Sequence, residues 1–281
     1  MADSSESGRS SATIDSHREF PGSHDSGMVD GNAVSKHNEE IHENARFWNR
    51  KPQLRAVYRQ FYSQLATHLP AGVSGSIVEC GSGLGNLKSV VPDCITTDLF
   101  PNPWIDQVEN VFELSFPDES VAALILFDVF HHLEYPGTAL AEIRRVLAPG
   151  GRLILFEPGM GFFGRWVLGL FHHEPLALRQ RIEWDAPEGW SPKRVRYYAA
   201  QGNAWRIFVR GEFNERLEGW RIVHRGFLAA LPWLASGGFR GPQLIPNRLF
   251  GAVEAMDRSL ASLSRLLASR LVVVLEKGRE S

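Results

Sequence analysis

A glycine-rich turn that follows a short apolar strand is the feature that most constrains this sequence. Segment 76–86 reads SIVECGSGLGN, and its first residues are typical of a buried parallel strand. Gly81, Gly83 and Gly85 let the backbone turn sharply and let a ligand lie close to it. The spacing is G-x-G-x-G, unlike the G-x-G-x-x-G of dinucleotide sites, and Glu79 favours a cationic ligand over a pyrophosphate. An ordinary strand-to-helix turn would contain the same glycines.

Length and composition bound the class of protein. The 281 residues suffice for one large domain, and a formal net charge of −2 leaves no large basic field, so no nucleic-acid partner is expected. The two cysteines form no C-x-x-C pair, and we expect no metal site. Residues 1–35 are rich in Ser, Gly and Asp and lack the apolar core of a secretory signal. We therefore expect a disordered N-terminal tail at 1–35, a domain at 36–281, a cytoplasmic location and no membrane-spanning helix. The composition leaves the oligomeric state open.

Periodicity predicts two helices before the glycine loop. One covers 38–50, and the second begins at Pro52 and repeats apolar residues at helical spacing. Polar aromatic residues of these helices either close over a bound ligand or pack in the core: His37, His42, Tyr58 and Tyr62.

After the loop, strands alternate with helices. Strands are predicted at 94–97, 121–127 and 152–156, with helices at 87–91 and from Thr138. This rhythm predicts an α/β fold with a Rossmann-like, doubly wound parallel sheet. An insertion that roofs the active site is expected at 159–219, where periodicity is poor, and a second substrate-side insertion is expected at 226–246. A sixth strand at 220–224, a long helix at 247–268 and a closing strand at 271–275 complete the prediction.

Two polar residues have the spacing of a nucleoside site. Asp98 ends the second strand, 17 residues after Gly81, where a carboxylate accepts hydrogen bonds from both ribose hydroxyls. Asn110 follows the loop that carries Trp104, an aromatic residue placed to cover an adenine. Asp98 as a solvated loop residue and Asn110 as the cap of a turn are the alternatives.

Several motifs occur in a recognisable order: ECGSGLG at 79–85, Asp98, LSFPD at 114–118, HHL at 131–133 and RVLAPGGR at 145–152. Together they resemble the class I S-adenosylmethionine-dependent methyltransferases, type 11 branch, over about 75–158. The resemblance implies a seven-stranded sheet of order 3-2-1-4-5-7-6 with the last strand antiparallel, and S-adenosyl-L-methionine as the cofactor.

The resemblance also implies roles for individual residues. The methionine end of the cofactor would lie on the loop at Glu79, Gly81, Ser82 and Gly83. Its ribose would bind Asp98, and its adenine would lie against Leu99, Asn110 and Val111. Phe127 and Asp128 would lie under the methionyl and sulfonium groups. This sequence departs from the family at Asn110, where aspartate is usual, and at Ser115, where proline is common; Asn still has a carbonyl oxygen to accept from the adenine amino group.

The methyl acceptor is less constrained. The insertions are rich in aromatic residues and arginine, which suit an acceptor that is a small molecule or a glycan- or lipid-linked hydroxyl or carboxyl. Alternatively, these aromatic residues form only the core of the insertions themselves. A hydroxyl acceptor would need a general base, for which the candidates are His131, His132, Glu157, His172 and His173. Each of these residues could instead have a purely structural role, in capping a helix, fixing a loop or packing in the insertion. A carboxylate acceptor would need no base.

Three further hypotheses remain at this point. The apolar pieces 159–171 and 226–239 suggest peripheral contact with a membrane or a lipid-linked acceptor. A noncatalytic S-adenosylmethionine-binding partner protein would carry the same cofactor motifs. An NAD-dependent oxidoreductase would use a similar sheet, but the glycine spacing and Glu79 disfavour it.

Overall fold

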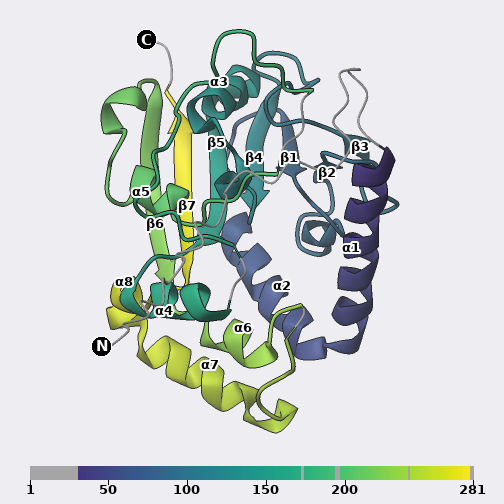
Figure 1. Ribbon diagram of the computed structural model, residues 1–281, viewed down its shortest axis with the longest axis vertical. Helices are drawn as coiled ribbons and strands as arrows, with labels where there is room; N and C mark the ends of the chain where they lie inside the picture. Colours follow the sequence, from purple (N-terminus) through teal and green to yellow (C-terminus); the bar gives the residue numbers. More distant parts are fainter. Residues whose placement is uncertain (1–30, 172–173, 194–196, 240, 279–281) are drawn as a thin grey trace, which may run out of the picture.

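The computed structural model describes residues 31–171, 174–193, 197–239 and 241–278. Its centre is a seven-stranded sheet of order β3-β2-β1-β4-β5-β7-β6 (Figure 1). Strands β1 to β5 pair in parallel, and β7 is antiparallel to both of its neighbours. The predicted strand order and the antiparallel last strand are confirmed. The strands are β1 Ser76–Cys80, β2 Ile95–Asp98, β3 Gln107–Val108, β4 Val121–Phe127, β5 Leu147–Pro158, β6 Trp220–Leu228 and β7 Arg270–Lys277.

Helices cover both faces of the sheet because successive side chains of each central strand point to opposite faces. Leu124 and Leu126 of β4 belong to the hydrophobic cluster that contains α3 (Pro136–Val146) and α5 (Asn203–Phe208). Ile125 belongs to the opposite cluster, with α2 (Pro52–Ala66). The strands are thus buried on both sides, as the continuous apolar run of β4 predicts.

Helix α1 (Gly31–Arg50) begins earlier than expected, so residues 31–35, predicted to be part of the tail, are helical. Residues 1–30 lie outside the described part of the chain. The insertions contain α4 (Phe162–Phe171), α5 and α6 (Leu231–Ser236). Strand β6 continues to Leu228, so residues 226–228, placed in the second insertion by the sequence, belong to the sheet.

The long helix predicted at 247–268 is wrong. The segment consists of a 3-10 turn η4 (Asn247–Leu249), helix α7 (Phe250–Ser259), a 3-10 turn η5 (Ala261–Leu263) and helix α8 (Ser264–Leu267). Only Phe250 of α7 is buried, and α8 has no buried residue. Helical stability comes mainly from packing of an apolar face, so a helix with so little burial breaks at Leu260. Three other 3-10 turns are η1 (Asn86–Ser89), η2 (Phe130–His132) and η3 (Asn214–Arg216).

The carboxyl edge of the parallel strands gathers the polar residues of interest. Strands β1, β2 and β4 end there at the glycine loop, at Asp98 and before Asp128, and β7, which runs the other way, begins there with Arg270. Ligands of open α/β sheets bind at this edge. Among the described residues, no helix has the length and apolarity to cross a membrane.

Candidate active site at the carboxyl edge of the sheet

The glycine loop after β1 is built as its sequence predicts. Gly81, Gly83 and Gly85 have φ values of +75°, +54° and +62°, which side chains rarely adopt. A Cβ at Gly81 would lie 2.4 Å from Cγ2 of Val129, whereas a Cβ at Gly83 would meet nothing within 4 Å. The loop therefore packs closely against the end of β4 at Gly81 and is open at Gly83, where a ligand can approach the backbone.

Asp98 links this loop to the end of β2. Its carboxylate accepts hydrogen bonds from the Gly83 amide at 2.9 Å and from the Leu99 amide at 2.7 Å. The Ser82 amide donates to the carbonyl of Thr97 at 2.8 Å. The structure thus brings Asp98, Leu99 and the glycine loop together.

Glu79 is the most unusual group of the site. It is buried, and its Oε2 has no hydrogen-bond partner among the described residues. Burial raises the pKa of Glu79 to about 8. Buried polar atoms nearly always have partners, so an unpaired carboxyl oxygen beside an open glycine loop fits a ligand that brings a positive charge. The ammonium group at the methionine end of S-adenosyl-L-methionine has that charge.

A pocket of about 210 Å³ lies over this loop. Its walls come from the loop itself, the end of β4, helices α1 and α2, and the segment after α6: Ile41, Asn44, Tyr58, Tyr62, Glu79, Gly81, Ser82, Gly83, Leu84, Asn86, Phe127, Asp128 and Phe239. Burial raises the pKa of Tyr58 to about 12 and that of Tyr62 well above its usual value, so both phenols are neutral. The two tyrosines line the pocket and pack in the core at once. His42 instead packs edge-on against Trp104, with ring centroids 5.0 Å apart, and the side chain of His37 lies outside the described ones.

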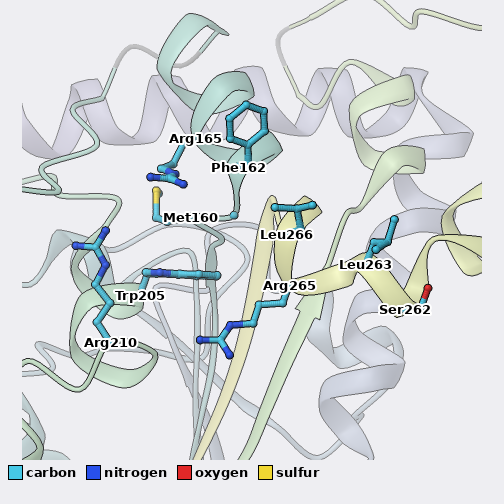
Figure 2. Close-up of a pocket in the computed structure, with 10 residues that line it drawn as sticks. Met160, Phe162, Arg165, Trp205, Arg210, Ser262, Leu263, Arg265 and Leu266 are labelled. Atoms are coloured by element: carbon cyan, nitrogen blue, oxygen red, sulfur yellow. The ribbon is translucent and has the colours of Figure 1, made fainter.

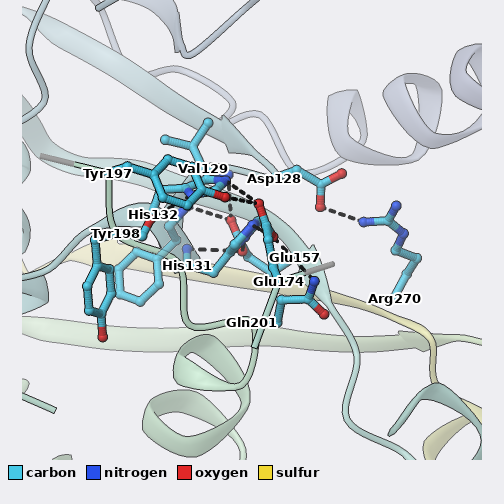
Figure 3. A network of polar contacts seen from close by, with 11 residues as sticks. Asp128, Val129, His131, His132, Glu157, Glu174, Tyr197, Tyr198, Gln201 and Arg270 are labelled. Carbon is cyan, nitrogen blue, oxygen red and sulfur yellow. Dashed lines mark hydrogen bonds and ion pairs between the residues drawn. The ribbon is translucent and has the colours of Figure 1, made fainter. Parts of the chain in front are cut away.

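Asp128 and Arg270 form an ion pair at the edge of this pocket (Figure 3). Asp128 has a φ of +55°, a strained conformation of the kind that clusters at functional sites. Arg270 is buried, its guanidinium lies 4.2 Å from the ring centroid of Trp233, and its Nε has no partner among the described residues. Sequence reasoning missed Arg270, although an arginine at the start of an otherwise apolar closing strand was a usable signal.

Glu157 and His131 form a buried pair behind the end of β4. Glu157 accepts hydrogen bonds from the amides of Val129, Phe130 and His131, and one of its oxygens lies 2.7 Å from Nδ1 of His131. Burial alone would lower the pKa of His131, but the neighbouring carboxylates, Glu157 foremost, raise it to about 10. His131 is therefore an imidazolium at neutral pH.

His132 and Glu174 extend this network toward the insertion (Figure 3). Nδ1 of His132 lies 2.8 Å from the carbonyl oxygen of Tyr198, and burial together with the charge of His131 lowers the pKa of His132 to about 4. Glu174 lies 3.5 Å from Nε2 of His131 and 3.7 Å from Nε2 of His132, and it accepts a hydrogen bond from Tyr197. Burial would raise the pKa of Glu174, but its contacts with both histidines and with the Tyr197 hydroxyl lower it well below its usual range.

His131, His132 and Glu174 also have the spacing of metal ligands, since one ligand atom of each lies within 4.8 Å of the others. His131, the protonated member of this group, lies between the carboxylates of Glu157 and Glu174. Glu174 was not among the predicted site residues, and its signal was the FHHEP segment at 171–175. The predicted candidates His172 and His173 lie outside the described residues.

The adenine side of the predicted site has other partners. The Asn110 amide group donates to the carbonyl oxygen of Pro192 at 2.8 Å, and its side-chain oxygen accepts from the Phe112 amide at 3.1 Å. Val111 is buried in the larger hydrophobic cluster. Asn110 therefore also ties the insertion to the sheet, and its carbonyl oxygen has one lone pair left for a ligand.

Comparisons with known proteins agree with this architecture. Residues 80–155 match the family described as methyltransferase domain. Human thiol S-methyltransferase TMT1B is 27% identical over 141 residues, which cover 42% of this chain and 56% of that protein. Among solved structures, a chain of the complex between the Haloferax volcanii Trm112 methyltransferase activator and a methyltransferase is 15% identical, with a TM-score of 0.50, over 88% of this chain and 98% of that one. A S-adenosylmethionine-dependent methyltransferase from Archaeoglobus fulgidus is 12% identical, with a TM-score of 0.48, over 79% and 94%.

The sheet order, the glycine loop and the match at residues 80–155 identify the domain as a class I S-adenosylmethionine-dependent methyltransferase domain of the type 11 family. The chain spans about half the length of the curated relative that it matches.

Proposed function

We propose that this protein transfers the methyl group of S-adenosyl-L-methionine to a small-molecule acceptor. The acceptor atom is an oxygen of a hydroxyl or carboxyl group, free or carried on a glycan or lipid. The observation that carries the proposal is a buried carboxyl oxygen of Glu79 that has no hydrogen-bond partner among the described residues and lies beside the open backbone of Gly83. The pairing of Asp98 with the same loop supports a nucleoside on the adjacent strand.

The cofactor, when bound, supplies a methyl group on a sulfonium that is already reactive. The protein therefore has to align donor and acceptor and to exclude water. We assign Glu79 to the ammonium group, Asp98 to the ribose hydroxyls, and Leu99, Asn110 and Val111 to the adenine. Phe127, Tyr58 and Tyr62 wall the pocket and keep it apolar beside the sulfonium.

Asp128 and Arg270 would act at the boundary between cofactor and acceptor. Their opposite charges neutralise each other in the free protein, and the side chain of Asp128 remains 29% exposed. A cationic ligand next to Asp128 would attract the Asp128 carboxylate away from Arg270. The Arg270 guanidinium would then be available to a carboxylate or hydroxyl of the acceptor. This arrangement favours an oxygen acceptor.

Of the described base candidates, His132 fits a hydroxyl acceptor best. Glu157 is occupied by three amides and by His131, and His131 is protonated, so neither is ready to accept a proton. We therefore assign these two residues to positioning the turn after β4. The side chain of His132 is 34% exposed and its low pKa keeps the ring neutral, so Nε2 has a free lone pair, although a pKa of about 4 makes it a weak base.

A noncatalytic S-adenosylmethionine-binding partner protein is the second candidate. The commitment of the Asn110 side chain to Pro192 and Phe112 favours it, because less of that side chain is available to the adenine.

Two measurements test these proposals. Calorimetric titration with S-adenosylmethionine, S-adenosylhomocysteine and NAD should show binding of the first two alone. A transfer screen with a labelled methyl donor across small-molecule, glycan, lipid and protein fractions should then label an acceptor. Tight S-adenosylhomocysteine binding without transfer to any fraction would select the noncatalytic alternative, and binding of NAD alone would refute both. With the acceptor identified, His132→Asn should slow transfer to a hydroxyl and leave cofactor affinity unchanged.

A further inference from the structure

A second pocket, of about 480 Å³, opens beside the carboxyl end of β5, and none of the described residues lines both this pocket and the one over the glycine loop. Figure 2 shows the guanidinium groups of Arg165, Arg210 and Arg265 around Met160 and the indole of Trp205. Arg165 comes from α4 and Arg265 from α8, while Arg210 follows α5. We call this the arginine pocket. None of the described residues that line it is acidic.

Among the described residues, few acidic groups balance the charges of the arginine pocket. Arg210 lies 3.7 Å from Glu212, whose carboxylate is also paired with Arg206 at 2.7 Å. Arg265 lies over the ring of Phe227, 5.8 Å from its centroid. Within the described chain, neither Arg165 nor Arg265 has an ion pair within 4 Å. Three guanidinium groups around one opening therefore favour an anionic group with phosphate-like oxygens.

An apolar surface adjoins the same pocket. Helix α4 exposes Phe162, Trp166 and Leu170 by 70%, 57% and 62%, and their spacing of four places them on one stripe. Leu263 and Leu266, 49% and 56% exposed, lie in η5 and α8 beside it. Large apolar side chains gathered in this way on a helix are rare on freely soluble surfaces.

Helix α4 is held firmly in this position. A Cβ at Gly164 would lie 2.0 Å from the carbonyl oxygen of Ala268, and a Cβ at Gly161 would lie 2.6 Å from the Ala268 amide nitrogen. The two glycines therefore let α4 pack directly against the backbone around α8. Phe162 belongs both to the apolar stripe and to the lining of the arginine pocket, so the two adjoin.

We propose that this surface docks the protein on an anionic lipid bilayer. The apolar residues Phe162, Trp166, Leu170, Leu263 and Leu266 enter the interface, and the three arginines bind lipid phosphates, a combination of apolar area and basic charge that is characteristic of interfacial helices. The docking surface lies at the carboxyl edge of the sheet, so binding would turn the cofactor pocket's edge toward the membrane. The inference goes beyond the proposed transfer reaction and does not depend on it.

The test uses the full chain with two kinds of vesicle, phosphatidylcholine alone and an equal mixture of phosphatidylcholine and phosphatidylglycerol. We expect cosedimentation with the mixed vesicles at low salt, weakening as salt screens the charges. Arg165→Glu should weaken partitioning at least about fivefold, the factor expected for one basic residue near an anionic surface. Arg59→Glu, an exposed position on α2, is the matched control and should have little effect.

The apolar part of the surface has its own readout. Brominated acyl chains should quench tryptophan fluorescence in the wild type, and Trp166→Phe should abolish most of that quenching. Leu170→Ser should weaken partitioning, whereas Val108→Ser, an equally apolar but distant position on β3 that is 49% exposed, should not. Each variant must keep its thermal unfolding and its affinity for S-adenosylmethionine.

Three outcomes would overturn the inference. They are the absence of binding to mixed vesicles, binding that the α4 variants leave unchanged, and concentration-dependent self-association of the free protein that Leu170→Ser abolishes, which would make a second copy the occupant. Cofactor titration is scored separately, so failure here leaves the proposed function standing and the reverse also holds.

Discussion

Replacement of Glu79 by glutamine tests the cofactor site through its proton balance. In the free protein, burial raises the pKa of Glu79 to about 8, so at pH 7 only about one molecule in ten carries the carboxylate. If the cofactor's ammonium group binds the ionised form, affinity is limited by that fraction. The penalty at pH 7 is about 1.4 kcal/mol, and at pH 6 it is about twice that.

The affinity for S-adenosylmethionine should therefore rise nearly tenfold between pH 6 and pH 7, a range in which the cofactor's own amino group stays largely protonated. Calorimetry in phosphate and imidazole buffers at pH 6.5 should detect the release of about one proton per cofactor bound. S-adenosylhomocysteine, which keeps the ammonium but lacks the sulfonium, should show the same slope.

Glu79→Gln should bind the cofactor more weakly and lose both the slope and the proton release. Glu218→Gln, an exposed position at the opposite edge of the sheet, should retain both. An affinity of the wild type that is constant between pH 6 and pH 7, or a slope that persists in Glu79→Gln, would refute the assignment of this carboxyl group to the ammonium.

Three further predictions concern neighbouring residues. Asp98→Asn should weaken S-adenosylmethionine binding by tenfold or more in calorimetry, because a charged acceptor of two loop amides is lost, and unchanged affinity would contradict its role. Gly81→Ala should lower the free energy of unfolding by about 2 kcal/mol, because alanine is strained at this positive φ and its Cβ would contact Val129. Adding Val129→Ala to Gly81→Ala should restore only the part of the stability that the contact with Val129 costs. Full recovery of stability would show that the positive φ is unimportant. His131→Asn should destabilise the fold by about 3 kcal/mol at pH 6, because it leaves the Glu157 charge without its partner. The folded-state pKa of His131 is about 10, so its contribution to the free energy of unfolding is complete below pH 6.5 and is lost as the pH rises through 10. In chemical denaturation, the difference in the free energy of unfolding between the wild type and His131→Asn should therefore shrink over this range.

The sequence by itself determined the strand and helix pattern of the fold and the sharp turn of the glycine loop. The apolar run of β4, the β-branched start of β1 and the glycines after it are local signals, and each acts within a few residues of where it is read. The sheet order was predicted from the resemblance of the ordered motifs to the class I methyltransferases, and the structure confirms it. Asp98 was predicted to end the second strand, and the structure adds its hydrogen bond from the Gly83 amide.

Segments with little burial were predicted less well. The sequence predicted one helix at 247–268, whereas the folded chain interrupts it at Leu260 and leaves Leu263 and Leu266 exposed. Periodicity indicates which side chains share a face, but only packing decides whether that face is covered.

Only the tertiary structure decided the charge states and the pairing of distant residues. Arg270 meets Asp128 across 142 positions of sequence because β7 runs antiparallel and begins where β4 ends. The pKa of Glu79 is raised by burial, and those of His131 and Glu174 are set by contacts between separate elements. The arginine pocket likewise combines three segments that no local pattern connects. Desolvation and Coulomb interactions depend on distances through space, so no local pattern along the chain contains them.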